Sequence, residues 1–367
     1  MKKKKNLALL TAGALVCAAM SGCGGSSSGS TAAAASAAAE TAAAETTAAA
    51  TTAAGSSASE SSGASGDAMY DGKVILGHSS WIGYVPLNIA DDMGFFDNHG
   101  ADVDIQAFES KADSRAAVAA GRIQGMSTTL DAHVMSVSSG MDIQVVLAED
   151  TSSGGDGICA LKSIPDFPSL KGHTIAMDTT GGASYFWTLY LMKQNNMKLE
   201  DVTVQNMSSG DAGAAFVAGQ VDAAATWEPW LSRAKETENG TVLVDSSDYP
   251  GIIVDALAMD SNFVKQYPGT VKAIVQGWYD ALDYIKTNPE DAYKIMMKYT
   301  GDETTEALEG ELAGVTFYDK AANEDYYKND IMDICKSAND LWLEYGLIEN
   351  EVDPSTFIND SFIGGTE

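Results

Sequence analysis

The sequence predicts an α/β fold divided into two lobes, and three observations predict it. Short apolar runs typical of strands alternate with runs of helical spacing from Lys73 onward. The part of the chain that can form a core, residues 67–367, is too long for one simple core. No internal repeat with a solenoid period interrupts the alternation. We therefore expect mostly parallel sheets, with ligands bound beyond the carboxyl ends of the strands.

The expected strands are short apolar runs, most of them bounded by glycine or polar residues. They cover residues 73–78, 103–108, 123–127, 143–147, 158–161, 174–177, 202–206, 223–226, 241–244 and 252–257. A short helix opens at Pro86 and ends at Gly94, and further helices cover 112–122, 129–138 and 184–195. The last of these is apolar almost all round, which predicts that it is buried. The C-terminal third is helical, with an apolar stripe from Val271 to Ile285.

The N-terminus has the pattern of an export signal over residues 1–22. Lys2–Lys5 are basic, Leu7–Met20 are almost wholly apolar, and two small residues precede Cys23. The apolar run is too short to span a membrane stably. The pattern resembles the lipobox of bacterial lipoproteins, which implies cleavage before Cys23 and lipidation of that residue. The alternative is a cleaved signal peptide with an incidental cysteine, and both place the mature chain outside the cytoplasm.

Residues 23–66 are predicted to be a disordered linker behind the lipid anchor. From Gly24 to Gly66 the chain contains only Gly, Ala, Ser, Thr and Glu. Such a segment buries too little apolar surface to offset its ordering entropy. The alternative is partial helicity of the alanine runs. In either form the segment would hold a folded domain away from a surface.

Charge and cysteine content exclude several functions. The formal charge is −29, and removing residues 1–22 takes away four lysines and no acids, which leaves −33. A chain this acidic is not expected to bind nucleic acid, and it would meet an anionic membrane only through its anchor. Cys159 and Cys335 remain in the folded part and are predicted to be buried free thiols, with a disulfide between them as the alternative. No spacing of metal ligands occurs, and no cofactor is expected.

Four motifs, in order along the chain, carry a family resemblance. They are Trp81–Leu87 with Met93–Phe96, Glu149–Ile158, Thr179–Phe186, and Ala215–Ala224 with Trp227–Trp230. With these motifs the chain resembles the nitrate/sulfonate/taurine-type solute-binding proteins of ABC importers. The resemblance implies a periplasmic-binding-protein-like (type II) fold, with two α/β lobes joined by two hinge crossings. We expect residues 67–152 and 253–367 in one lobe and 153–252 in the other.

Polar strand-to-helix loops supply the first candidate ligand-binding residues. Thr180, Ala183 and Ser184 lie at a helix start, where unpaired N–H groups could bind a sulfonate, nitrate or carboxylate. Ser127, Thr128 and, just inside the next helix, Asp131 repeat this arrangement in the other lobe. Ordinary helix capping is the alternative for both loops.

Aromatic and acidic residues supply the other candidates. Trp81 and Trp227 follow strands, and Tyr84 belongs to the first motif, so they are expected to wall the crevice. Trp230 is expected to pack at the core or hinge, and Trp187 and Trp278 in the core. Five acids lie at predicted strand ends or crossings, where a carboxylate could face a bound ammonium. They are Asp150, Glu228 and Asp255, which we take as candidate ligands, together with Glu149 and Asp156.

The resemblance implies an extracytoplasmic, lipid-anchored binding protein rather than an enzyme. We expect a monomer that delivers a small organic solute to an ABC permease and its ATPase. The solute is expected to be a sulfonate or a taurine-like aminosulfonate. A cationic or neutral heterocycle, such as a thiamine-precursor pyrimidine, is the alternative solute. A sensor subunit and an extracytoplasmic enzyme are alternative functions, although the sequence has no G-x-S-x-G or H-E-x-x-H motif.

Overall fold

The computed structural model describes residues 68–108 and 110–364, all of which belong to one structural unit. The predicted signal peptide, the lipidation site Cys23 and the predicted linker lie outside the described residues. Within the described part, no helix combines the length and the apolar character that crossing a membrane requires.

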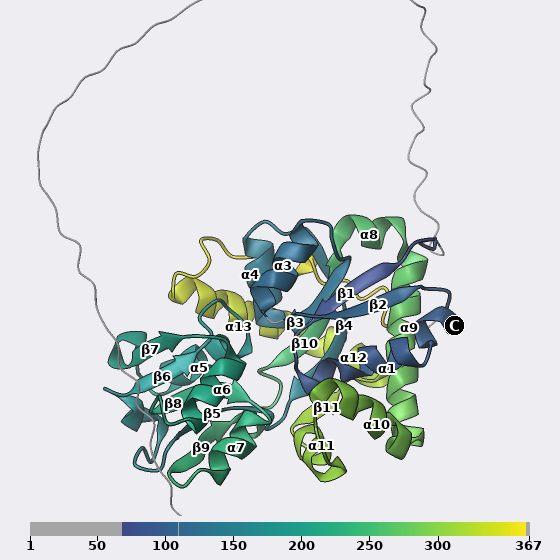
Figure 1. Ribbon diagram of the computed structural model, residues 1–367. Coiled ribbons are helices and arrows are strands. Elements are labelled where there is room, and N and C mark those ends of the chain that lie inside the picture. Colours follow the sequence, from purple (N-terminus) through teal and green to yellow (C-terminus); the bar gives the residue numbers. More distant parts are fainter. Residues whose placement is uncertain (1–67, 109, 365–367) are drawn as a thin grey trace, which may run out of the picture. The chain divides into compact units, whose positions relative to one another are not determined.

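The described strands form two separate sheets, which Figure 1 shows in different halves of the ribbon. The first has the order β11-β4-β10-β3-β1-β2 and consists of β1 (Val74–His78), β2 (Val103–Ala107), β3 (Gly125–Thr129), β4 (Ile143–Ser152), β10 (Val254–Asp260) and β11 (Val315–Phe317). The second has the order β7-β6-β8-β5-β9 and consists of β5 (Asp156–Leu161), β6 (Thr174–Met177), β7 (Thr203–Asn206), β8 (Ala223–Trp227) and β9 (Gly240–Asp245). This architecture confirms the predicted α/β fold with two lobes.

The chain passes twice between the sheets, once from β4 to β5 and once from β9 to β10. Both sheets are mixed, so the prediction of mostly parallel sheets was wrong. β1 pairs in parallel with β2 and β3, whereas β10 runs antiparallel to β3 and β4. In the second sheet β5 is likewise antiparallel to both of its neighbours. The reason is that β5 and β10 are the first strands after the two crossings. Each therefore runs in the direction opposite to that of its neighbouring strands.

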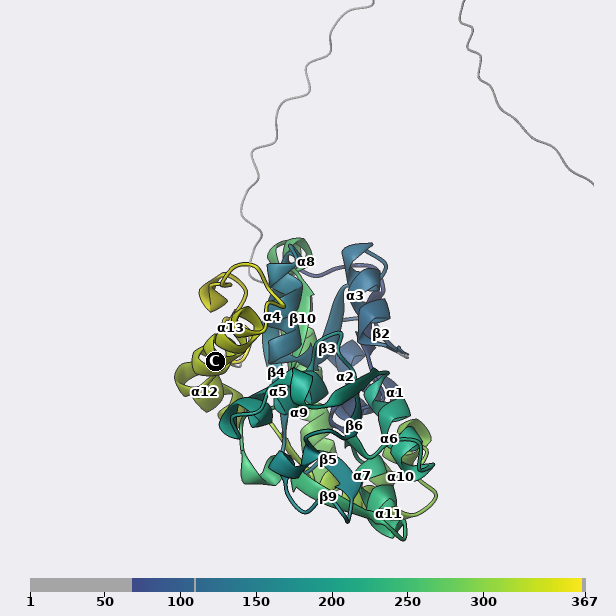
Figure 2. The same cartoon turned by 90° about the vertical axis from the view of Figure 1, so that its left-hand side faces the viewer.

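Helices cover the sheets. Around the first sheet α1 packs on α9 and α10, and α4 on α13, while α5 and α6 contact β8 of the second sheet (Figures 1 and 2). The described helices are α1 (Val85–Asp92), α2 (Phe95–Asn98), α3 (Lys111–Ala119), α4 (Leu130–Ser138), α5 (Ala183–Gln194), α6 (Ser209–Val217), α7 (Trp230–Glu236), α8 (Ser261–Gln266), α9 (Pro268–Thr287), α10 (Pro289–Thr300), α11 (Thr305–Leu312), α12 (Lys320–Asn329) and α13 (Ile331–Glu344), with short 3-10 helices at 82–84, 167–170, 199–201, 246–248 and 354–356.

Two strands differ from their predicted bounds in a way that matters for the site. β4 was expected to end at Leu147 but continues to Ser152, and every residue from Ala148 to Ser152 is buried. The sequence pattern missed this extension because polar residues there suggested a loop. β3 was expected at 123–127 but spans Gly125–Thr129. This shift carries Thr128 and Thr129 into the strand rather than into the following loop.

The core confirms several predictions about single side chains. Trp187 and Trp278 are buried, and α5 is buried over most of its length. Cys159 and Cys335 are free and buried, and burial raises the pKa of each thiol to about 12. Both thiols are therefore unreactive apolar packing groups rather than nucleophiles.

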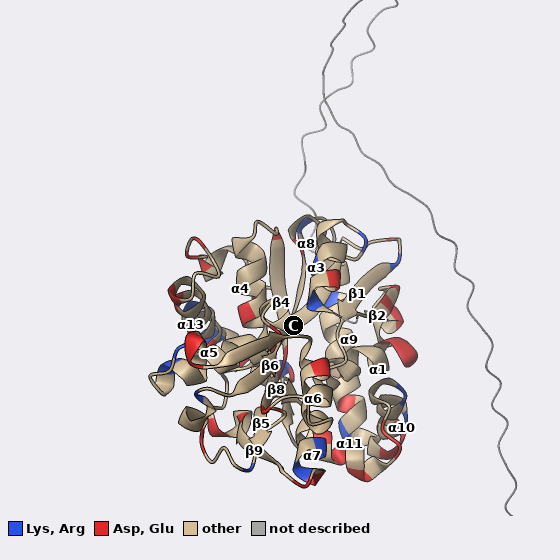
Figure 3. Ribbon diagram, turned by 60° about the vertical axis from the view of Figure 1, so that its left-hand side comes forward, with Lys and Arg blue, Asp and Glu red and all other residues tan. Residues whose placement is uncertain are grey.

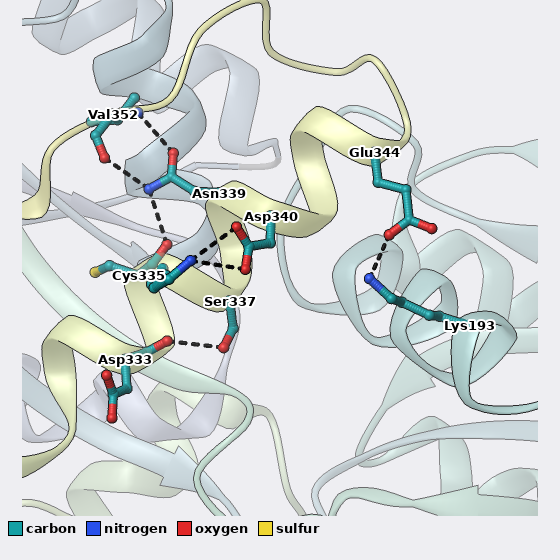
Figure 4. Close-up of polar contacts among 9 residues, drawn as sticks. Lys193, Asp333, Cys335, Ser337, Asn339, Asp340, Glu344 and Val352 are labelled. Atoms are coloured by element: carbon teal, nitrogen blue, oxygen red, sulfur yellow. Dashed lines mark hydrogen bonds and ion pairs between the residues drawn. The ribbon is translucent and has the colours of Figure 1, made fainter.

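Helix α13 joins elements of both sheets. The Trp342 ring lies 5.6 Å from the Phe186 ring of α5, centroid to centroid, and its indole N–H donates to the Asp131 carbonyl at the start of α4 (N–O 3.0 Å). Lys193 of α5 also pairs with Glu344 of α13 (Figure 4). The C-terminal end of α13 is fixed by Asn339, whose side chain bonds the backbone of Val352 (Figure 4).

Candidate functional site

A small cavity lies where residues of the two sheets meet near the crossings. It is lined by Ser79, Trp81, Tyr84, Lys111, Thr129, Asp156, Ala183, Trp227 and Asp255. Its volume of about 10 Å³ holds a single water molecule. A solute of amino-acid size therefore needs the walls to separate, as hinged lobes allow.

A wider pocket of about 290 Å³ adjoins this cavity. The two share Ser79, Lys111 and Trp227, and the rest of the pocket is lined by Ser80, Ser110, Asp178, Ser208, Ser209, Gly210, Asp211, Ala214 and Trp230. Trp230 is half-buried and the Arg233 guanidinium lies 4.7 Å from its ring centroid, so it faces this pocket rather than the core.

The wall from the first lobe consists of paired, buried side chains. The Trp81 indole N–H donates to the Asp150 carboxyl group, with N–O distances of 3.1 and 3.4 Å. The Tyr84 hydroxyl donates to Asp255. In the sheet, Asp255 of β10 lies directly opposite Asp150 of β4 and Thr129 of β3. Three neighbouring strands therefore present polar groups to the same end of the first sheet.

Burial determines the protonation of these acids. It raises the pKa of Asp150 well above its ordinary value, and the nearby Asp255 carboxylate raises it further. Burial also raises the pKa of Glu149 well above its ordinary value, although the Ser127 hydroxyl donates to Glu149 (O–O 2.8 Å). Burial raises the pKa of Asp255 to about 7 and that of Asp156 to about 6. At neutral pH Asp156 is mostly ionised and Asp255 about half ionised, while burial shifts Asp150 and Glu149 toward their protonated forms.

Several buried polar atoms of the first lobe have no hydrogen-bond partner. They include Oγ1 of Thr128 and Thr129, Oδ2 of Asp131 and Oε2 of Glu149. Thr129 is also one of the residues that line the cavity. Burying a polar group without a partner costs about 1–3 kcal/mol, which a bound polar solute would recover.

The wall from the second lobe is built from backbone and small side chains. Ala183, the first residue of α5, lines the cavity, and Gly181 and Gly182 before it have φ values of 101° and 104°. This loop touches the first lobe, where an Arg115 nitrogen donates to the Thr180 carbonyl (N–O 3.1 Å). The Thr180 side chain is exposed and bonds Asp178 (O–O 2.6 Å), so it points away from the cavity.

Two further predicted residues lie outside the cavity lining. The Ser184 hydroxyl is buried and bonds Ser209 (O–O 2.7 Å) inside the second lobe. The Glu228 carboxylate accepts hydrogen bonds from the Ser232 backbone N–H (2.9 Å) and hydroxyl (3.0 Å), which caps α7. Glu228 therefore caps a helix, whereas Ser184 bonds a side chain at the start of α6 and caps no helix.

The sequence prediction missed Lys111, the described cation that lines the cavity. Its ammonium lies 5.7 Å from the Trp227 ring centroid, and its charge lowers the pKa values of Asp131, Asp156 and Asp255 against the effect of burial. The chain has 51 acidic and 22 basic residues, and acidic segments predominate along the ribbon (Figure 3). A signal was available, because Lys111 follows strand β2 at a helix start, beside the N-cap Ser110.

The described residues contain no group of three or more His, Cys, Asp or Glu placed to hold a metal ion. Glu149 and Asp150 lie on β4 and Asp255 on β10, and their side chains are bonded by Ser127, Trp81 and Tyr84 respectively. The cavity lining combines two carboxyl groups, one ammonium group and the start of a helix.

Comparison with known proteins shows which proteins this chain is similar to. The sequence profile of the NMT1-like family matches residues 67–298. A candidate binding protein of Brucella abortus is 27% identical over 214 residues, which cover 58% of this chain and 66% of the relative. The chain thus spans just under two thirds of that relative. The taurine-binding periplasmic protein of Escherichia coli is 25% identical over 209 residues, covering 56% of this chain and 64% of the relative.

Among solved structures, the periplasmic aliphatic sulphonate-binding protein of Escherichia coli is similar with a TM-score of 0.64 and 19% identity. The superposition covers 78% of this chain and 97% of the other. At that identity the likeness concerns the fold, and it confirms the periplasmic-binding-protein-like architecture expected from the sequence.

Proposed function

The chain belongs to the NMT1-like family, which confirms the predicted resemblance to nitrate/sulfonate/taurine-type solute-binding proteins, and from this we propose that it is the solute-binding protein of an ABC importer. In this proposal it captures a small sulfonate or taurine-like aminosulfonate between its two lobes and delivers it to a permease and its ATPase. It performs no reaction on the solute and works as a monomer.

The observation that carries this proposal is the presence of groups for both charges in one cavity lining. Asp156 and Asp255 line the cavity together with Ala183 at the start of α5, where the helix N-terminus favours an anion. A zwitterion with an acid at one end and an ammonium at the other would satisfy both kinds of group. Trp81 and Trp227 would flank the short alkyl chain between them.

The proposed location is the outer face of the cell membrane, with Cys23 carrying the lipid. The basic, apolar and small residues that precede Cys23 support this, together with the linker composition that follows it. The periplasmic location stated in the names of relatives is consistent with it. Mass spectrometry of the protein purified from membranes tests the anchor, because a Cys23→Ala variant should lose the lipid mass and the membrane association together.

We also propose that the lobes are bounded as the sequence suggested, at 67–152, 153–252 and 253–367. The crossing from β4 to β5 lies between Ser152 and Asp156, and the return lies between Asp245 and Val254. Solute would enter with the lobes apart and be buried when they close around these two crossings.

Isothermal titration tests the function with a panel of taurine, ethanesulfonate, ethylamine and an aminopyrimidine. The protein is first unfolded and refolded, and native mass spectrometry must show it free of carried-over ligand. We expect taurine to bind, and a Trp227→Ala variant to bind it about tenfold more weakly because one wall of the cavity is lost. Absence of binding to every compound, or turnover of a bound compound, would contradict the proposal.

A heterocycle is the second candidate solute. The observation that favours it is that each tryptophan lies beside an acid, Trp81 beside Asp150 and Trp227 beside Asp156. The ring of a heterocyclic solute could stack on the tryptophans while its nitrogen groups donate hydrogen bonds to the carboxyl groups. Tighter binding of the aminopyrimidine than of taurine in the same titration would select this solute class.

A further inference from the structure

Lys111 lies where its positive charge can determine whether the cleft binds anionic or cationic groups. Lys111 begins α3 directly after the N-cap Ser110. Its side chain lines both the small cavity and the adjoining 290 Å³ pocket, and among the described cavity residues it is the one with a positive charge.

The ammonium lies against the N-terminus of a helix. A Cβ added to Gly182, the N-cap of α5, would lie 2.6 Å from Lys111 Nζ. Helix α5 has 12 residues, so its first turn carries a partial positive charge and N–H groups without helical partners. Two positive groups side by side repel each other, and a negative group near them is favoured by both, as the lowering of the Asp131 pKa by Lys111 and by the Gly182 N–H indicates. This pairing is specific to an anion, because a cation would be repelled twice.

The carboxylates behind Lys111 do not neutralise it directly. Its charge acts on Asp131, Asp156 and Asp255, yet within residues 68–108 and 110–364 Lys111 forms no direct ion pair with any of them. Asp131 keeps a buried oxygen without a partner, and the Thr129 hydroxyl in the cavity lining is also unpaired. These oxygen atoms can therefore still accept hydrogen bonds from a bound cation when Lys111 is present.

We propose that Lys111 is the charge-selectivity residue of the cleft: together with the first turn of α5 it holds the acid group of the solute, while Asp156 and Asp255 receive the ammonium. This inference rests on the proposed solute-binding function. Without Lys111 the charged side chains of the cavity are all acidic, so the cleft excludes acids and accepts organic cations. One side chain thus separates zwitterions from simple amines.

The test compares Lys111→Met, Lys111→Arg and the control Lys265→Met by isothermal titration. Lys265 is exposed on α8, away from the cavity lining, so its replacement reports the general effect of removing a lysine. The probes are taurine, ethanesulfonate and ethylamine, which share a two-carbon frame and differ in their charged ends. Thermal unfolding of each variant checks that it is folded.

We expect Lys111→Met to weaken taurine binding about 30-fold or more, because truncating one member of a buried charged contact has effects of this order. Ethylamine binding should be unchanged or tighter in the same variant, Lys111→Arg should stay within about fivefold of wild type for taurine, and Lys265→Met should match wild type. The opposite movement of taurine and ethylamine is a result that general damage to the fold would not produce.

Two outcomes would overturn the inference. The first is taurine binding by Lys111→Met within about threefold of wild type, and the second is equal weakening of taurine and ethylamine. A wild-type protein that binds none of the three probes would instead remove the proposed aminosulfonate function itself. The two failures are therefore separate results of one experiment.

Discussion

The two walls of the cleft are built on different principles. The wall from the first lobe is made of buried side chains bonded to one another, with Trp81 on Asp150 and Tyr84 on Asp255. The wall from the second lobe is made largely of loop backbone, with Gly181 and Gly182 ahead of Ala183. Its larger side chains are the half-buried Trp227 and the buried Asp156 of β5.

This difference indicates that the two walls have different roles in binding a solute. Side chains fixed by packing and hydrogen bonds cannot rearrange cheaply, so the first wall is preorganised for one charge pattern. Backbone N–H groups at a helix start can meet an anion with little side-chain ordering. Changes in the first wall should therefore cost stability, and changes in the second should alter binding with little loss of stability.

The largest expected effect comes from placing the same methyl group in each wall. A Cβ on Gly83 would lie 2.1 Å from Asp150 Oδ2 and 2.3 Å from Trp81 Nε1, whereas a Cβ on Gly182 would meet the mobile end of Lys111. We expect Gly83→Ala to lower the free energy of unfolding by about 3 kcal/mol through overpacking. Gly182→Ala should cost about 1 kcal/mol, from its positive φ. Denaturant unfolding measures both, and equal losses would contradict the contrast between the walls.

Loss of one hydroxyl in the first wall should have the next largest effect. Tyr84→Phe removes the donor to Asp255, whose carboxyl group is buried, and leaves it with one partner fewer. We expect a loss of about 2 kcal/mol, within the usual range for an unsatisfied buried group. The matched control is Tyr185→Phe on α5, whose hydroxyl forms no hydrogen bond among the described residues and whose loss should cost little. A Tyr84→Phe variant as stable as wild type would show that the pair does not support this wall.

The fold was largely predictable from sequence, whereas the site was predictable only where it depends on strand ends. Trp81, Trp227 and Asp255 follow or lie on strands of the predicted sheets, and all three line the cavity. Whether any predicted residue binds a solute stays a prediction. Thr180 and Glu228 could not be separated from capping residues by pattern, because the partners Asp178 and Ser232 are local and polar in either case.

Lys111 escaped prediction for a different physical reason. Its importance depends on the loop before α5, which lies about 70 positions further along the chain and is brought beside it only by folding. Spacing within one segment carries no signal of such contacts. The shift of β3 by two residues is similar, since pairing with β10 decides which of Ser127, Thr128 and Thr129 ends the strand.

Asp255 of the first wall should also make stability depend on pH, in addition to Asp156 of the second wall, whose pKa burial raises to about 6. Burial raises the pKa of Asp255 to about 7, whereas the unfolded chain releases that proton near pH 4. The folded state then holds a proton that the unfolded state has lost, so stability falls as pH rises through 7. Comparison with Asp255→Asn cancels the other groups, including Asp156, Lys111, Tyr84 and the opposing His133, whose pKa is lowered to about 4 by burial.

Relative to Asp255→Asn, wild type should lose about 1 kcal/mol of unfolding free energy between pH 6 and pH 8. Thermal or urea unfolding at the two pH values measures the change in the gap between the proteins. A constant gap would mean that Asp255 is ionised throughout, and the first wall would then carry a permanent buried charge.

The smallest expected effect tests the second wall at its exposed end. Thr180 bonds Asp178 through its hydroxyl and its backbone N–H (2.8 Å), and its side chain is exposed. Thr180→Ala removes only the hydroxyl bond, so we expect less than about 0.5 kcal/mol in stability and taurine affinity within twofold of wild type. The backbone of this loop, rather than its hydroxyl groups, would then be what the second lobe offers to a solute. A tenfold loss of affinity would instead mean that Thr180 turns into the cleft when the solute binds, and the second wall would owe its specificity to side chains as the first does.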